Sequence, residues 1–514
     1  MANPDTAMAG ISTPAATIIA CPLQKVPLEV LLRITSFLTT PELGNTRLTC
    51  RSVEQALFTT FTNEFFTRKQ FMISETSLQA LIDISKSRLS GYLRMVHIGL
   101  DRFAYALQVS DQNARNIRQK QLHDGQFSML STGYHRDMLA EAFRNLSNLE
   151  DVVIRDFNSN RRSRDNPGKQ WTSYGSTTAF RETGHRPGQG GGQAWGPYPS
   201  TAYGSSVFIS VLFALGQANA KPKGIEYMSR ARNHLRDCAF NIPSYMEPSV
   251  IPVLENLEKL HIDIDLLGGN DFPVDTSGHP SDMMLRGFLL KLKNIKHLRI
   301  NETHSSVNGP DMLLKWLGSE VSTSAPASLS APPSASGPGP APASISPTSA
   351  PLSSIPSPEY PQLEALDFGM MNVEAQHILA VTRKFSSTLK RLELHKITLR
   401  RRLPEGHTGA SPKVNMWNKF LEKLKDIPNL DLHHIKVSLP QQHWTSRSRC
   451  FVAFEDTRDN VSQYTGPDWK HFVEHEMRTK VTVQWSHEDS GDSDDDEEEE
   501  DESDGIWDQY ALDL

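Results

Sequence analysis

The sextets LRMVHI (93–98), LEKLHI (257–262) and LKRLEL (389–394) share one pattern, and this pattern decides the fold class. Apolar residues occupy the first, fourth and sixth positions, so the last three residues alternate as they do in a half-buried strand. With small variations the pattern recurs in LEDVVI from Leu149, IKHLRI from Ile295, LEALDF from Leu363 and LHHIKV from Leu432. So many copies of one strand signal predict a repetitive architecture.

Two stretches of unusual composition interrupt the copies. Residues 158–203 are rich in Gly, Arg and Ser, and residues 321–358 consist almost entirely of Ser, Pro, Ala and Gly. Neither stretch has enough apolar side chains to offset its ordering entropy, so we expect two disordered insertions. Without them the copies recur every 26 to 43 residues, and several follow a helix-like segment. One helix and one strand per repeat predict an α/β solenoid with a concave face of parallel strands.

These repeats resemble leucine-rich repeats in their L-x-x-L-x-L core. The chain departs from that family because it lacks the regular Asn after the strand, so the resemblance implies a degenerate repeat domain over residues 62–440. Strand-like RCFVAF and KVTVQW suggest a C-terminal cap over residues 441–487. Only the positions between the leucines could recognise a substrate, and for any single one of them a merely solvated role is the favoured interpretation; examples are His297, Arg299, Lys390 and Glu393.

Charge is distributed unevenly along the chain of 514 residues, whose formal net charge is -7. Residues 488–514 contain 15 acidic residues and no Lys or Arg, which leaves the rest mildly basic. We therefore expect a disordered acidic tail. It ends in an apolar motif, GIWDQYALDL (505–514), which we interpret either as a docking helix or as a frayed terminus. Residues 1–24, rich in Ala, Thr and Pro, are also expected to be disordered.

Several functional classes find no support in the sequence. The four cysteines are far apart, there is no basic region before an apolar core, and no run of 18 apolar residues occurs. We therefore expect an intracellular protein, cytoplasmic or nuclear, without a membrane partner. No phosphate loop or hydrolase signature is present, so we predict a non-enzymatic protein without a cofactor.

Two weaker signals have simpler explanations. His433, His434 and His443 could suggest a metal, but adjacent residues of a strand point to opposite faces, so we predict no metal site. The Arg- and Gly-rich insertion with interleaved aromatic residues resembles RNA-binding low-complexity sequence. It has no RGG run, so we interpret it as a flexible loop and expect no nucleic-acid partner.

The stretch VPLEVLLRITSFLTTPEL (26–43) precedes the repeats. It predicts a first helix from Pro27 to about Leu38 and a second helix capped by Thr40, with a third helix beginning near Arg51. At 100° per residue, the apolar arc of the first helix covers about 220°, whereas an ordinary surface helix has an apolar stripe of roughly 100°. Part of this surface must therefore meet either the following domain or another protein.

This region, residues 25–61, resembles an F-box. The family's Leu-Pro-x-Glu start appears as Val26-Pro27-Leu28-Glu29, and its Ile-x-x-x-Leu as Ile34 and Leu38. Its later Pro-x-x-Leu region appears in shortened form as Pro41-Glu42-Leu43, and its Cys-Arg pair as Cys50-Arg51. Where the family has a Trp, this chain has Val53. The whole arrangement is similar to that of many fungal F-box proteins.

The resemblance implies a substrate-receptor subunit of an SCF-type cullin–RING ubiquitin ligase. The F-box would bind a Skp-type adaptor and through it a cullin, and the repeat domain would hold an unidentified protein substrate. The alternative is a scaffold or interaction protein that acts outside ubiquitination. The adaptor-binding residues expected from the resemblance are Pro27, Leu28, Leu31, Ile34, Leu38, Pro41 and Leu43.

Overall fold

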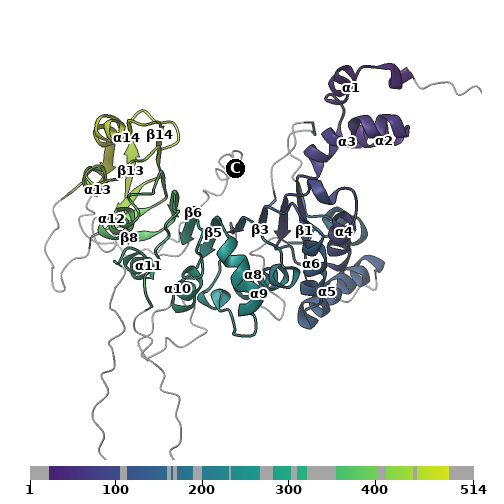
Figure 1. Ribbon diagram of the computed structural model, residues 1–514, viewed down its shortest axis with the longest axis horizontal. Helices are drawn as coiled ribbons and strands as arrows, with labels where there is room; N and C mark the ends of the chain where they lie inside the picture. The colour runs from purple at the N-terminus through teal and green to yellow at the C-terminus, as the bar shows by residue number, and fades with distance from the viewer. Residues whose placement is uncertain are drawn as a thin grey trace, which may run out of the picture. The chain divides into compact units, whose positions relative to one another are not determined.

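The computed structural model divides the chain into two compact units (Figure 1). Unit 1 comprises Met1–Phe66 and Asn160–Trp171, and unit 2 comprises Thr67–Ser159 and Thr172–Leu514. The structure describes residues 22–104, 113–158, 164–165, 171–188, 200–230, 233–266, 282–302, 309–320, 355–401, 413–443 and 449–485.

Unit 1 contains the three predicted helices, α1 (Leu28–Thr35), α2 (Thr40–Leu48) and α3 (Arg51–Phe65). The first ends three residues before the predicted Leu38, because the chain tightens there into bonds from Phe37 N–H to the Ile34 carbonyl and from Leu38 N–H to the Thr35 carbonyl. The predicted cap of α2 is wrong by one residue. Thr39 is the cap, and its N–H donates to the Glu42 carboxylate over 2.8 Å.

The core of unit 1 is small. Its buried side chains are Leu31, Leu43, Val53, Leu57 and Phe65, drawn from all three helices. The helix α3 runs to Phe65, so the unit extends beyond the predicted limit at residue 61. The Arg47 guanidinium stacks 3.4 Å from the centre of the Phe61 ring and lies 2.9 Å from the Glu54 carboxylate, which joins α2 to α3.

Unit 2 is built on a sheet whose strands follow one another almost in chain order. All neighbouring pairs from β1 to β11 are parallel, and β14 closes the series as an antiparallel edge. In sheet order the strands are β1 (Arg68–Met72), β2 (Met95–Gly99), β3 (Asp151–Arg155), β4 (Gly224–Met228), β5 (Lys259–Ile264), β6 (His297–Glu302), β7 (Ala365–Gly369), β9 (Arg391–His395), β11 (His434–Ser438) and β14 (Val461–Thr465).

Every predicted sextet contributes to a strand of this sheet, which confirms the strand predictions. The first leucine or isoleucine of each sextet is buried just before its strand. The strand β4 carries only a weaker copy of the pattern, IEYM from Ile225, and two strands were missed. The strand β1 (RKQFM) lacks the leucine spacing, and β14 (VSQYT) is a largely polar edge strand.

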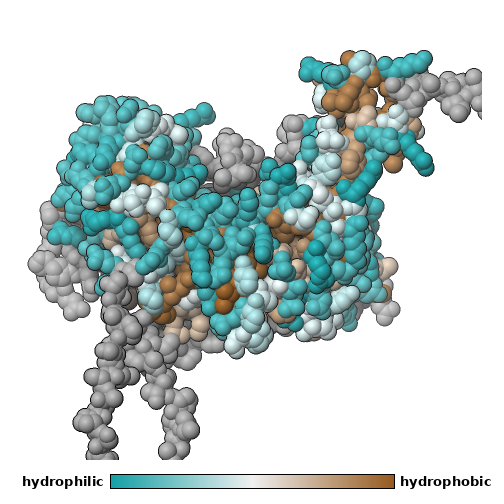
Figure 2. All heavy atoms as spheres, in the orientation of Figure 1, coloured by the Kyte–Doolittle hydropathy of each residue, from teal (hydrophilic) through white to brown (hydrophobic). Residues whose placement is uncertain are grey.

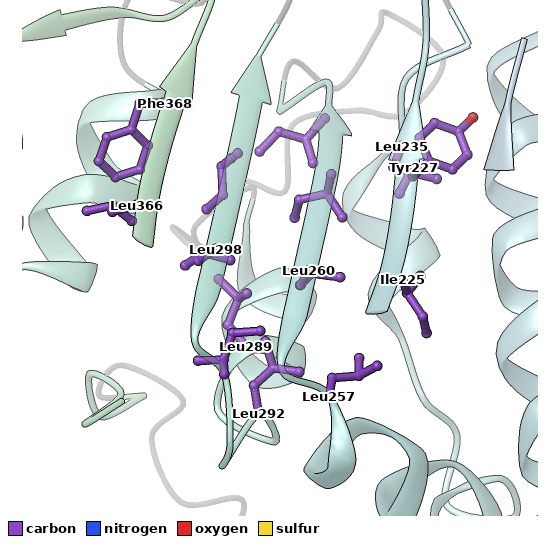
Figure 3. Packing of buried hydrophobic residues seen from close by; sticks show 14 of the residues in the cluster. Ile225, Tyr227, Leu235, Leu257, Leu260, Leu289, Leu292, Leu298, Leu366 and Phe368 are labelled. Carbon is purple, nitrogen blue, oxygen red and sulfur yellow. The ribbon is translucent and has the colours of Figure 1, made fainter. Parts of the chain in front are cut away.

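The helices between these strands cover one face of the sheet. Figure 1 shows α6, α8, α9 and α10 along the same side of the strands. Leu260 and Leu298 point from β5 and β6 into a core that also receives Leu257, Leu289 and Leu292 (Figure 3). The α-helices of unit 2 are α4 (Glu75–Ser85), α5 (Ala114–Thr132), α6 (Tyr134–Arg144), α7 (Ser176–Thr183), α8 (Ser200–Ala218), α9 (Glu247–Asn256), α10 (Met283–Leu289), α11 (Gly309–Leu317), α12 (Ala375–Lys384), α13 (Met416–Lys425), and, after the last strand of this sheet, α14 (Trp469–Phe472) and α15 (Arg478–Lys480).

A second sheet adds a short strand after each of β7, β9 and β11. At the corner, Met370, Lys396 and Leu439 have φ values of 56°, 50° and 49°, in the left-handed region. The same backbone turn therefore recurs in three successive repeats. The strands, in sheet order, are β15 (Val481–Gln484), β13 (Arg449–Phe454), β12 (Gln441–His443), β10 (Thr398–Arg400) and β8 (Asn372–Glu374). RCFVAF and KVTVQW thus form strands as predicted, in β13 and β15.

The predicted insertions need correction. The expectation of disorder over 158–203 fails for residues 171–188, where α7 forms and Tyr174 N–H donates to the Gln70 carbonyl at the edge of β1. The helix α8 also begins inside the predicted insertion. Residues 355–358 of the second insertion are placed, with the Ser357 side chain buried. The acidic tail, the 505–514 motif and residues 1–21 lie outside the described residues.

The architecture is therefore mixed α/β, as predicted. Within the described ranges, no helix has both the length and the apolar character needed to cross a bilayer.

Candidate functional site

Four large apolar side chains of α1 and of the turn that follows it are not covered by unit 1. Leu28, Val30, Ile34 and Phe37 are 48%, 48%, 45% and 74% exposed. We call these four residues the docking face. Val30, Ile34 and Phe37 fall within about 60° of one another at 100° per residue, and Leu28 is exposed at the start of the helix, about 120° or more away from them. Figure 2 shows hydrophobic residues at the surface of the unit 1 helices.

The wide apolar arc of α1 is thus divided between two environments. Leu31 is 3% exposed and packs into the core of unit 1, together with the partly buried Leu32 and Leu38. The docking face occupies the rest of the arc. The core of unit 1 therefore covers only part of the wide apolar arc of α1.

The expected adaptor-binding residues do not form one continuous surface. Leu28 and Ile34 belong to the docking face, and Pro27 and Pro41 are exposed at the starts of α1 and α2. Leu31 and Leu43 are buried inside unit 1. Any effect of these two leucines on a partner would therefore be indirect, through the shape of the unit.

Sequence reasoning placed Val30 and Phe37 in the apolar arc but did not include them among the site residues. Their position on the helical wheel, opposite the side of α1 that holds Leu31 and Thr35, was the available signal. Leu48 at the end of α2 is 84% exposed and was also missed. A single apolar residue in a short helix carries no pattern from which its exposure could be predicted.

Unit 2 offers a second surface, the face of the larger sheet opposite its core. Because side chains alternate along a strand, the residues between the buried leucines point to this side. We call it the polar face. Its members on the central strands are Lys259, His261 and Asp263 of β5; His297, Arg299 and Asn301 of β6; Asp367 of β7; Arg391, Glu393 and His395 of β9; and His434, Lys436 and Ser438 of β11.

Most charged groups of the polar face form a ladder across neighbouring strands. Lys259 lies 2.9 Å from Asp151 and 2.6 Å from Glu226. His261 Nε2 lies 3.2 Å from His297 Nδ1, and His297 Nε2 lies 2.8 Å from the Asp367 carboxylate.

The ladder continues onto the last parallel strands. There Glu393 lies 2.6 Å from the Arg391 guanidinium and 3.0 Å from His434 Nε2. Side chains that pair in this way leave few free charges for a ligand.

Burial shifts the protonation of several groups on this face. Burial, assisted by the neighbouring His297, holds the pKa of His261 well below its usual value, so the ring is neutral at pH 7. Burial raises the pKa of Asp263 to about 6. Burial and the cations Arg299, Lys396 and Lys436 lower the pKa of His395 to about 3.

Two cations of the polar face take no part in this ladder. Within the described part of the chain, neither Arg299 nor Lys436 makes an ion pair, and the Arg299 Nε lies 3.5 Å from Asn301 Oδ1. Both side chains are partly exposed. They are the groups of the polar face that remain available to an anionic partner.

The other expected recognition residue, Lys390, precedes β9 rather than lying on it, and its ammonium is 3.1 Å from the Asp431 carboxylate. In the described residues no group of three or more His, Cys, Asp or Glu side chains is placed to hold a metal ion.

Comparison with known proteins places this chain in no group: no protein-family model matches it, and no curated protein matches it.

Proposed function

We propose that this protein is a substrate-receptor subunit of an SCF-type ubiquitin ligase, with unit 1 as an F-box and unit 2 as a degenerate leucine-rich-repeat-like solenoid. The observation that carries the proposal is the docking face on α1. Fully burying an exposed large apolar side chain contributes about 1.5–3 kcal/mol; these four, of which three are already about half buried, still offer enough apolar surface to anchor a partner helix or groove. A Skp-type adaptor, joined to a cullin, is the occupant that the sequence motif indicates.

The polar face is the proposed substrate surface. It presents side chains from at least five neighbouring strands, a width suited to a protein segment rather than to a small molecule. The receptor would act by proximity, because tethering a substrate raises the effective concentration of its lysines near a conjugating enzyme. This role needs no catalytic group or cofactor and places the protein in the cytoplasm or the nucleus.

Co-purification from cells with the adaptor and the cullin tests the proposal. The wild-type chain should recover both, and Ile34→Asp should recover neither, because a carboxylate would be buried without a partner in the contact. Ile34 is a better test position than Leu38, which packs partly against the core of unit 1.

The matched control is Ile117→Asp. Ile117 lies on α5 in unit 2 and is 51% exposed, so the same substitution is made outside the docking face. This variant should recover both proteins. Recovery of the adaptor without cullin would favour a scaffold that acts outside ubiquitination, and recovery of neither by the wild-type chain would end the F-box interpretation.

A further inference from the structure

Unit 1 includes residues that come from far along the chain. Arg164 and Asp165 belong to the connection between β3 and α7, yet they pack among the helices of unit 1. We call this pair the clasp.

Arg164 uses its whole guanidinium group. Its Nε and Nη2 donate to the two oxygens of the Glu64 carboxylate over 2.5 Å and 2.6 Å, a bidentate pair with α3. Its Nη1 donates to the carbonyl of Thr35 over 2.9 Å and to that of Leu38 over 2.8 Å. The Arg164 side chain is only 11% exposed, so these bonds are largely shielded from water.

Asp165 binds the start of the next helix. One carboxylate oxygen accepts the Thr40 N–H over 3.1 Å, and the other accepts the Thr40 hydroxyl over 2.7 Å. A carboxylate at the first turn of α2 and a guanidinium at the last turn of α1 each face the helix end that favours their charge. The two residues therefore bridge α1 and α2 at the corner between them.

The docking face includes this corner. Phe37, its most exposed residue, lies between Thr35 and Leu38, whose carbonyls both accept from Arg164. The backbone of the corner has turn bonds of 3.2 Å from Phe37 and Leu38 N–H, and the Arg33 guanidinium lies 5.3 Å from the centre of the Phe37 ring. These contacts are all local to the corner, whereas the clasp ties the corner's carbonyls to Glu64 of α3.

We infer that Arg164 and Asp165 are positioning residues for the docking face, so that the adaptor-binding module consists of the N-terminal helices together with a segment more than a hundred residues away. This inference rests on the proposed function. It goes beyond the motif, because residues 25–61 alone would present the same apolar side chains without the group that orders their corner.

The test compares full-length variants by adaptor titration and by amide hydrogen exchange in the free protein. Arg164→Ala and Asp165→Ala should each weaken adaptor binding about tenfold or more and speed exchange at residues 37–40. Exchange around Leu57, inside the core of unit 1, should stay unchanged.

Conservative variants separate positioning from general stability. Asp165→Asn keeps an oxygen that can accept the Thr40 N–H and should bind the adaptor within about threefold of wild type. Arg164→Lys keeps the charge but cannot serve Glu64 and two carbonyls together, so it should behave like Arg164→Ala. Arg181→Ala, an exposed arginine of α7, is the matched control and should match wild type in both measurements.

Binding within twofold of wild type for both alanine variants would overturn the inference, and so would faster exchange throughout α1–α3, which would show unfolding instead of a loosened corner. A wild-type chain that binds no adaptor would refute the proposed function separately. In that case faster exchange confined to 37–40 would still support an ordered corner, and unchanged exchange there would overturn it.

Discussion

Unit 1 and unit 2 differ in how much apolar surface they leave exposed. In unit 1 three helices bury a small cluster around Leu31 and Leu57 and leave four large apolar side chains of α1 and its following turn exposed. In unit 2 the larger sheet buries its leucines completely against helices and presents a charged, internally paired face on its other side. The two surfaces therefore suit different partners, an apolar one for the docking face and a polar one for the polar face.

The difference follows from element type and size. An apolar stripe of about 100° can be covered by one neighbouring layer, whereas an arc of about 220° cannot be covered by two short helices. Strands alternate between two faces, so the same chain segment can supply a core and a polar surface. Exposed apolar surface in unit 1 is thus a property of α1 itself, which a partner can use.

The same substitution in both regions should give the largest contrast. Ile300 on β6 is fully buried, and Ile300→Asp should lower the free energy of unfolding of unit 2 by more than about 4 kcal/mol, because it buries a carboxylate without a partner. Ile34→Asp, at an exposed site, should change the unfolding of unit 1 by less than about 1 kcal/mol. Urea unfolding followed by circular dichroism measures both. Equal losses would contradict the division between core and docking face.

Glu302 is an exception to the apolar core of unit 2 and gives the next largest effect. It is fully buried at the end of β6, and in the described part of the chain both its carboxyl oxygens lack hydrogen-bond partners. Burial, with a further contribution from Asp265, raises the pKa of Glu302 to about 9. In the unfolded chain the pKa of Glu302 is near its ordinary value of about 4.3. The protonated carboxyl therefore makes its full contribution to stability below that pH, and this contribution is lost as the pH rises toward 9.

Between pH 5 and pH 8 the free energy of unfolding of wild type should therefore fall by on the order of 1 kcal/mol per pH unit relative to Glu302→Gln. Urea titrations of both proteins at the two pH values measure this difference. Glu359→Gln, at an exposed position, is the matched control and should track wild type. A difference in unfolding free energy between wild type and Glu302→Gln that is the same at both pH values would show that the Glu302 carboxyl is not protonated in the folded protein.

The polar face gives the smallest expected effects. Arg391→Ala removes a 2.6 Å contact to Glu393 and should cost about 1 kcal/mol, whereas Lys436→Ala removes no ion pair and should cost less than about 0.5 kcal/mol. Chemical denaturation of the two variants beside wild type measures the difference. The reverse order would mean that Lys436 supports the fold and is not free for a partner.

The strands could be predicted because their signal is local. Alternation of buried and polar residues, preceded by a buried leucine or isoleucine, is written within six consecutive residues, and β2, β3, β5, β6, β7, β9 and β11 of the larger sheet follow it. Two strands that lack it were missed: β1 (RKQFM) has no leading leucine, and β14 (VSQYT) is a largely polar edge strand. The prediction of disorder from composition was likewise wrong for residues 171–188, where α7 forms beside β1 although the surrounding sequence is rich in Gly and Arg.

The sequence by itself determined the α/β class, the strands that carry the leucine pattern and the excess apolar arc of α1, because each depends on residues within one or two helical turns or one strand. Only the tertiary structure decided which part of that arc stays exposed, because the answer depends on where α2 and α3 pack. Only the tertiary structure brought Arg164 and Asp165 to Thr35, Leu38 and Thr40. Contacts between residues more than a hundred positions apart leave no periodic mark in the sequence, since Arg164 and Asp165 by themselves read as ordinary charged residues of a polar loop.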